Sequence, residues 1–88
     1  MKLKCELVIS NIVDEIVAVP VGESAKDYHM VLKLNEESQK IIELLNKGAS
    51  LEEICAEIKK EYSIEDNLLR KYVTEFIEQL KEYGLIEE

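Results

Sequence analysis

The segment YHMVLKLNEES, residues 28–38, constrains the fold of this chain more than any other feature. Its first seven residues are mostly apolar, with Lys33 as the one charge, which is typical of a β-strand. Asn35, Glu36 and Glu37 then form a good helix start, because asparagine caps a helix and acids suit its first turn. The strand therefore enters a helix with almost no loop. In so short a chain, a strand held at one end is expected to lie at the edge of its sheet, which raises the question of what pairs with that edge.

Two further strand-like runs precede this junction. The runs CELVIS and EIVAVPVG are joined by residues 11–14, which predicts a β-hairpin. Pro20 has no N–H to donate, so the second strand is expected to end or bulge near it. The sequence GESAKD then predicts a loop before the strand of residues 28–34. Three antiparallel strands result, and the third of them is an edge.

Three helices are predicted after Asn35. The first ends at Gly48, and the second begins at a capping box formed by Ser50 and Glu53. The third begins between residues 63 and 66 and runs to Tyr83, with Gly84 as a left-handed cap. The sequence thus predicts one α+β domain over residues 1–88, in which an N-terminal three-stranded antiparallel sheet is followed by three α-helices. The second and third helices have helix-turn-helix spacing.

The charge of the chain disfavours nucleic acid as a partner. The formal net charge is −8, and residues 35–88 hold fourteen acids against seven bases. Nucleic-acid binding depends largely on neutralising phosphates with lysine and arginine. No run is long enough to span a bilayer, and the short apolar run near the start is broken by polar residues, so no secretion signal is expected. A soluble protein of the cytoplasm is predicted, with no membrane partner.

The sequence also offers little for catalysis or for a metal site. Cys5, Cys55 and His29 are scattered, without metal-ligand spacing, and the cysteines are expected to act as small buried hydrophobes. No paired carboxylates, phosphate-binding loop or Ser/His/Asp arrangement is present. We therefore expect no catalytic residue, no metal and no cofactor.

The third helix carries an apolar stripe wider than one contact requires. Either the whole stripe covers the core, or one flank with Val73 and Ile77 lines a groove against the third strand. Arg70, Thr74 and Lys81 lie just beyond that flank. With Lys33 on the strand, they would give the groove a basic margin and favour a peptide with an acidic residue.

Together these features resemble a known family, the PqqD-like proteins, which are peptide-recognition elements in the synthesis of ribosomally made, post-translationally modified peptides. The resemblance covers nearly the whole chain and is carried by VPVGESAKDYHMVLKLNEES, by the spacing IIELL…GASLEEICAEI…EYSIED and by FIEQLKEYGLIEE. It implies a winged-helix-like, non-catalytic domain. Such domains bind the leader segment of a precursor peptide as an added strand and present it to a modifying enzyme, often a radical-SAM enzyme.

Carried over by position, the resemblance implies that the leader lies along the third strand and packs against the third helix. The strand residues implied are His29, Met30, Val31, Leu32, Lys33 and Leu34, and the helix residues are Leu69, Arg70, Val73, Thr74 and Ile77. The chain departs from the family's usual pattern at Val13, where a turn glycine is common, at Ser38, where the first helix often has glycine, and at Ile42, where an aromatic residue is frequent.

Two other functions are compatible with the same elements. The helix-turn-helix spacing allows a winged-helix DNA-binding regulator, although the segment from Glu65 to Glu88 is acidic. An exposed edge strand also allows a module that forms homodimers by strand pairing.

Overall fold

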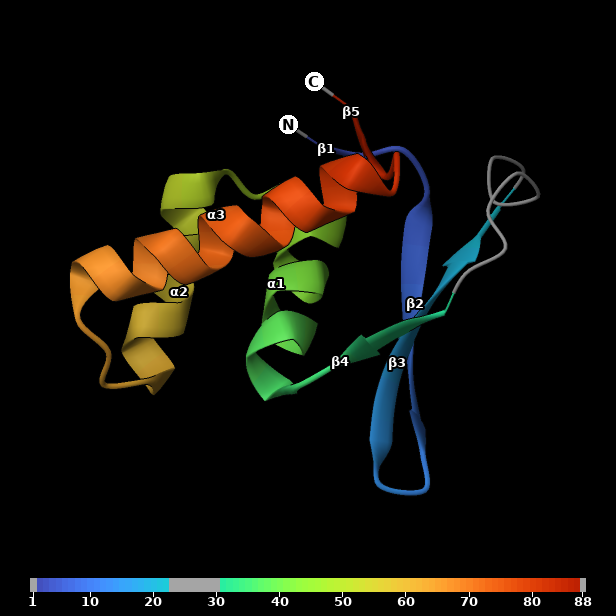
Figure 1. Ribbon diagram of the computed structural model, residues 1–88, viewed down its shortest axis with the longest axis horizontal. Coiled ribbons are helices and arrows are strands. Elements are labelled where there is room, and N and C mark those ends of the chain that lie inside the picture. Colours follow the sequence, from blue (N-terminus) through green and yellow to red (C-terminus); the bar gives the residue numbers. More distant parts are fainter. Residues whose placement is uncertain (1, 23–30, 88) are drawn as a thin grey trace.

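A computed structural model of the chain describes residues 2–22 and 31–87. Its helices and strands follow the expected order, with a short strand added at each end (Figure 1). The elements are β1 (Lys2–Leu3), β2 (Glu6–Ile12), β3 (Glu15–Val21), β4 (Leu32–Leu34), α1 (Glu36–Asn46), α2 (Leu51–Glu61), α3 (Asp66–Glu82) and β5 (Ile86–Glu87). The expected N-terminal part of the third strand, Tyr28, His29 and Met30, lies outside the described residues.

The main sheet has the order β2-β3-β4 and is antiparallel throughout, so the predicted α+β class is confirmed. Strands β2 and β3 pair from Glu6 with Val21 to Ile12 with Glu15, and the strand ends one residue after Pro20. The two terminal strands, β1 and β5, form a separate antiparallel pair that was not expected from the sequence. Figure 1 shows the hairpin of β2 and β3 projecting beyond the helices.

The hairpin turn is formed by two residues with left-handed backbone. Val13 has φ 28° and Asp14 has φ 64°. Two consecutive residues with positive φ are typical of the tight turns that match the twist of antiparallel strands, and Asn-Gly is the preferred pair there. Val13 is β-branched and 89% exposed, so it is strained in this conformation without gaining burial in return.

Replacing this strained residue should stabilise the protein. We expect Val13→Asn to raise the free energy of unfolding by about 1 kcal/mol, because asparagine adopts the left-handed region more readily. Urea unfolding followed by circular dichroism measures this, and Val8→Asn, in the middle of β2, serves as the control that should not stabilise. A lower midpoint for Val13→Asn than for the wild type would contradict the turn geometry.

Each helix boundary follows from its capping residues. Asn35 accepts a hydrogen bond from the Ser38 N–H at 2.8 Å, and Ser50 and Glu53 form the predicted capping box. Gly48 and Gly84 have positive φ, and the residue after each glycine donates back to a carbonyl near the helix end, Leu44 and Leu80 respectively. These two turns satisfy orphan carbonyls and reverse the chain.

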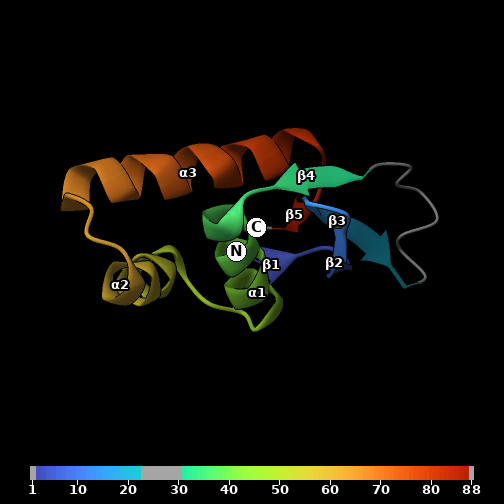
Figure 2. The ribbon, with the colours of Figure 1, turned by 90° about the horizontal axis from the view of Figure 1, so that it is seen from below.

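The core lies between one face of the sheet and the helices. Along each strand, every second side chain points toward this face. Leu7 of β2 and Ala18 of β3 are two of these side chains, and both are buried. Helix α1 contacts β1, β2, β3 and β4, while α2 and α3 pack against each other (Figure 2). Leu85, after the Gly84 cap, is fully buried and joins the same cluster.

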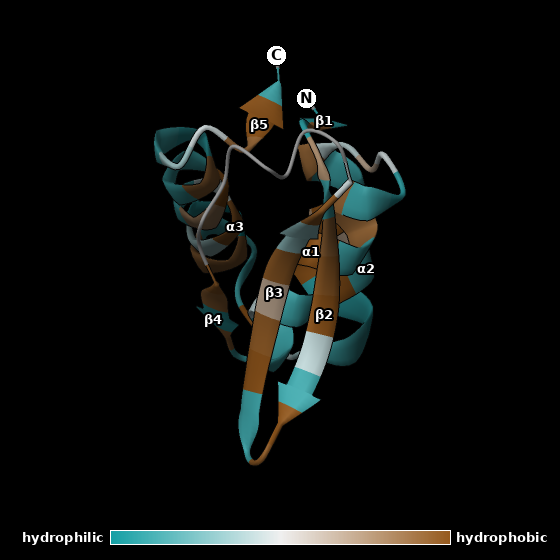
Figure 3. Cartoon of the chain, turned by 90° about the vertical axis from the view of Figure 1, so that its right-hand side faces the viewer, coloured by the Kyte–Doolittle hydropathy of each residue, from teal (hydrophilic) through white to brown (hydrophobic). Residues whose placement is uncertain are grey.

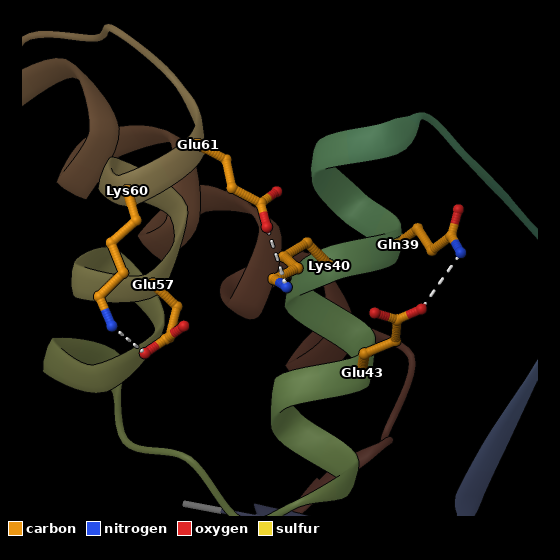
Figure 4. Close-up of polar contacts among 6 residues, drawn as sticks. All are labelled: Gln39, Lys40, Glu43, Glu57, Lys60 and Glu61. Atoms are coloured by element: carbon orange, nitrogen blue, oxygen red, sulfur yellow. Dashed lines mark hydrogen bonds and ion pairs between the residues drawn. The ribbon is translucent and has the colours of Figure 1, made fainter.

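Polar contacts on the helix surfaces add little to this core. Lys40 of α1 pairs with Glu61 of α2 at 3.3 Å, while Glu57 with Lys60 and Gln39 with Glu43 are contacts within single helices (Figure 4). Exposed pairs of this kind contribute roughly 0–1 kcal/mol each. The packing of apolar side chains therefore determines how the helices sit on the sheet.

Candidate functional site

The free edge of β4 follows from the hydrogen-bond alternation of the sheet. The two-residue turn makes Ile12 and Glu15 a hydrogen-bonded pair, and such pairs alternate with non-bonded pairs along an antiparallel ladder. Ile16 and Ala18 of β3 must then point their N–H and C=O groups toward β4, where they face Leu34 and Leu32. Lys33 lies between these two residues, so its N–H and C=O point away from β3.

The opposite edge of the sheet is partly covered. At Leu7 of β2, the N–H donates to Asn46 Oδ1 at 3.4 Å and the C=O accepts from Asn46 Nδ2 at 2.9 Å. The Asn46 side chain thus occupies both outward groups of Leu7 in the way a neighbouring strand would. No strand among the described residues pairs with the outer edge of β4. The outward N–H and C=O of Lys33, unlike those of Leu7, have no hydrogen-bond partner among the described residues, and they lie next to α3.

Strand β4 and helix α3 lie on the same side of the molecule (Figures 2 and 3). Two adjoining clefts lie between them. The smaller cleft, of about 260 Å³, is lined by residues 31–34 and by Phe76, Gln79, Leu80 and Tyr83. The larger, of about 480 Å³, shares Lys33, Phe76 and Gln79 with it and is also lined by Ser38, Tyr72, Thr74, Glu75, Glu78 and Glu82. We call these two clefts together the β4–α3 groove. Its floor is aromatic, and its outer wall is a row of α3 glutamates.

A polar cluster around the buried Ser38 ties α3 to the end of β4. Tyr72 of α3 donates its hydroxyl to Asn35 Oδ1 at 3.3 Å, and its oxygen lies 3.2 Å from Ser38 Oγ. Because the one Tyr72 proton goes to an acceptor, the Ser38 hydroxyl is the donor in the second contact. Ser38 is only 6% exposed, so this bond satisfies a group that water cannot easily reach. The cap residue of α1 is thereby tied to the middle of α3.

Removing the hydroxyl of Tyr72 should therefore weaken the fold at the groove. We expect Tyr72→Phe to lower the free energy of unfolding by about 1 kcal/mol, because the Ser38 hydroxyl loses its partner. In a Ser38→Ala background the same change should cost less, since the buried donor is then absent. Urea unfolding of the four variants gives the coupling, and strictly additive costs would contradict this hydrogen-bond cluster.

The structure separates the helix residues expected at the site into two groups. Leu69, Val73 and Ile77 are buried in the core, which is the first of the two interpretations of the apolar stripe. Arg70 lies on the side of α3 that faces α2, where its guanidinium pairs with Glu52 at 3.1 Å. Thr74 lines the larger cleft. The flank of α3 expected to face β4, that of Val73 and Ile77, is thus not the flank that does so.

The residues that do face β4 lie on the other flank of the same stripe. Tyr72, Phe76, Gln79 and Tyr83 line the groove from α3. On the opposite side it is lined by Leu32, Lys33 and Leu34 of β4 and by Val31, which was expected in the strand but lies just before it. His29 and Met30 lie outside the described residues. Tyr72, Phe76 and Tyr83 belong to the apolar stripe predicted from the sequence. The hydroxyl groups of the two tyrosines are the sequence signal that this side of the stripe lies at a surface, whereas Val73 and Ile77 have no polar group.

Introducing an aspartate on one flank of α3 or on the other tests which flank is buried. Val73 is 0% exposed, so we expect Val73→Asp to lower the free energy of unfolding by at least about 3 kcal/mol, because the carboxylate has no partner in the core. Gln79→Asp places the same residue on the exposed flank of the same helix and should stay within about 0.5 kcal/mol of the wild type. Equal stability of the two variants in urea unfolding would contradict the assignment of the flanks.

The cysteines do not form a reactive site. Cys5 is buried in the core and Cys55 is half-buried on α2, and both are free. Burial raises the pKa of both thiols, and for Cys55 this outweighs the opposing effect of Arg70. Within residues 2–22 and 31–87, no group of three metal-ligating side chains lies together, and no helix is long and apolar enough to cross a membrane.

The sequence profile of the family described as "Coenzyme PQQ synthesis protein D (PqqD)" matches residues 15–86, from β3 to β5. The chain belongs to this family. No curated protein matches the sequence. The matched region contains β4, α3 and the groove between them, so the PqqD family resemblance covers the complete candidate site.

Solved structures give the same fold. The chain is similar to a structure described as "TbiB1 in Complex with the TbiA(beta) Leader Peptide", with 26% identity and a TM-score of 0.75, covering 99% of this chain and 95% of that one. It is also similar in fold to "Lasso peptide synthetase B1 complexed with the leader peptide", with 21% identity and a TM-score of 0.72, covering 99% and 96%. Both neighbours were solved as complexes with a leader peptide.

Proposed function

We propose that this protein binds the leader segment of a ribosomally made precursor peptide as an added strand on β4. The observation that carries the proposal is the orientation of the Lys33 backbone. Its N–H and C=O point away from β3, beyond the edge of the sheet, on the side of the β4–α3 groove. The membership of the PqqD family and the likeness to TbiB1 in complex with a leader peptide support the same function.

Strand addition divides affinity and selection between different groups of the protein. Main-chain hydrogen bonds to Lys33 bind any peptide in extended conformation, and alternate side chains of the added strand select among peptides. Side chains on the inner face of the peptide contact Phe76 and Tyr83, which offer apolar area and one hydroxyl. Tyr83 is exposed in the free protein, so an apolar peptide side chain can bury it.

The domain itself performs no chemistry in this proposal. It holds the leader so that a separate modifying enzyme, of which a radical-SAM enzyme is the first candidate, acts on the remainder of the precursor. The groove suits this task, because one wall is a strand edge and the other is a helix held by the Asn35–Ser38–Tyr72 cluster. A leader bound between them would be fixed in both register and orientation.

Hydrogen exchange of the Lys33 amide tests the proposal. The probe is a synthetic leader of a short precursor peptide encoded beside the gene of this protein. We expect its addition to slow exchange at Lys33 strongly, because this N–H gains an acceptor, while the amides of β2 change little. Protection of β2 or α2 without a change at Lys33 would contradict the proposed edge. Protection of Lys33 that rises with protein concentration in the absence of peptide would favour a strand-paired homodimer.

A proline at the same position provides the matching variant. Proline has no N–H, and on an edge strand with its nitrogen facing outward it is compatible with the sheet. We expect Lys33→Pro to weaken leader binding by roughly tenfold, whereas Lys33→Ala, which keeps the N–H, should bind within about threefold of the wild type. Fluorescence anisotropy of the labelled leader measures both. Equal affinities of the two variants would rule out main-chain pairing at Lys33.

A further inference from the structure

The charges around the β4–α3 groove are the reverse of those expected from the sequence. Glu75, Glu78 and Glu82 line the larger cleft, and Lys33 is the one basic residue that lines it among the residues that the structure describes. Arg70, expected at this margin, pairs with Glu52 beside α2 instead. The groove is therefore acidic along the wall formed by α3.

Two of these glutamates are available to a ligand. Glu78 pairs with Lys81 at 3.3 Å, and Lys33 is held by Glu15 at 3.6 Å on β3. Glu75 and Glu82 have no ion-pair partner among the residues that the structure describes, and both are exposed. Any positive charge that reaches this wall would thus meet two uncompensated carboxylates.

The geometry of α3 places these carboxylates within reach of a bound strand. At 100° per residue, Glu75 and Glu82 lie about 40° and 60° beyond Gln79, in the direction away from the core. An added strand on β4 would lie over Phe76, Gln79 and Tyr83, so only a long side chain on it extends to the next row of the helix. Lysine and arginine have this length, and their apolar stems can cover the exposed ring of Tyr83 while the charged group reaches a carboxylate.

We infer that the β4–α3 groove selects an extended peptide that carries a lysine or arginine two residues from its apolar anchor, on the same face of the added strand. This inference rests on the proposed function and specifies its ligand. The period of two follows from the alternation of side chains along a strand, which directs both residues toward α3. An acidic residue at that position would face three glutamates and be repelled.

A peptide library tests this inference without knowledge of the natural leader. Ten-residue peptides with all positions randomised are displayed and selected on the wild-type protein at low salt. We expect lysine and arginine to exceed aspartate and glutamate by at least about fivefold two residues from an apolar anchor. The strongest binder is then synthesised with this basic residue kept or replaced by glutamine.

Two double variants show whether the acidic wall is responsible. Glu75→Gln/Glu82→Gln removes the two available carboxylates, and Glu43→Gln/Glu57→Gln removes two charges from α1 and α2 outside the groove. We expect the glutamine peptide to bind about three- to tenfold more weakly than the basic peptide on the wild type and on the control. On Glu75→Gln/Glu82→Gln the two peptides should bind almost equally. The difference should also shrink at high salt, because exposed charges are screened.

The outcomes separate this inference from the proposed function. The inference is overturned, and strand addition left intact, if the selected peptides protect the Lys33 amide but show no preference for a basic residue. The same holds if they protect this amide and the preference for the basic residue persists on Glu75→Gln/Glu82→Gln. Selected peptides that protect only other segments, or the absence of any binder, overturn both.

Discussion

The Oδ1 atom of Asn35 joins the strand and the helix that form the two walls of the β4–α3 groove. It accepts from the Ser38 N–H, which begins α1 directly after β4, and from the hydroxyl of Tyr72, which fixes α3 beside the same junction. The hydrogen bonds of this one oxygen thus act together with the apolar packing of α3 to set the distance between a strand edge and a helix that are far apart in the sequence. An amide oxygen suits this position better than a hydroxyl would, because it accepts both bonds without needing a proton of its own.

Once that distance is set, the two walls of the groove differ in what they contribute. The strand wall is backbone, and in the proposed function its unused groups at Lys33 pair with an extended chain of any sequence. The helix wall is side chains, arranged in rows from buried Leu80 through Phe76 and Gln79 to exposed Glu75 and Glu82. In this proposal, affinity from one wall and selection from the other together allow the domain to recognise one peptide. On the opposite edge, the Asn46 side chain occupies the outward backbone groups of Leu7.

The sequence predicted the elements well, because each is specified locally. Asn35, Ser50 and Gly84 are capping residues whose effect lies within one turn of chain, and the helix boundaries followed from them. The choice between the two flanks of α3 was not local: Val73 and Phe76 are both apolar, and only the packing against α1 and α2 decides which is buried. The pairing of β1 with β5 was missed because two-residue strands have no pattern of their own. The partner of Arg70 depends on the approach of α2, so the charge of the groove could not be predicted either.

Isotope-filtered NMR can show whether a peptide pairs with the backbone of Lys33. With uniformly ¹⁵N,¹³C-labelled protein and an unlabelled bound peptide, nuclear Overhauser effects report which protons lie across the interface. If the leader pairs with β4, we expect contacts from the peptide backbone to the amide and Hα protons of residues 32–34, together with contacts from peptide side chains to the rings of Phe76 and Tyr83. Contacts to β2 or to the exposed side of α2, with none to Lys33, would contradict this pairing.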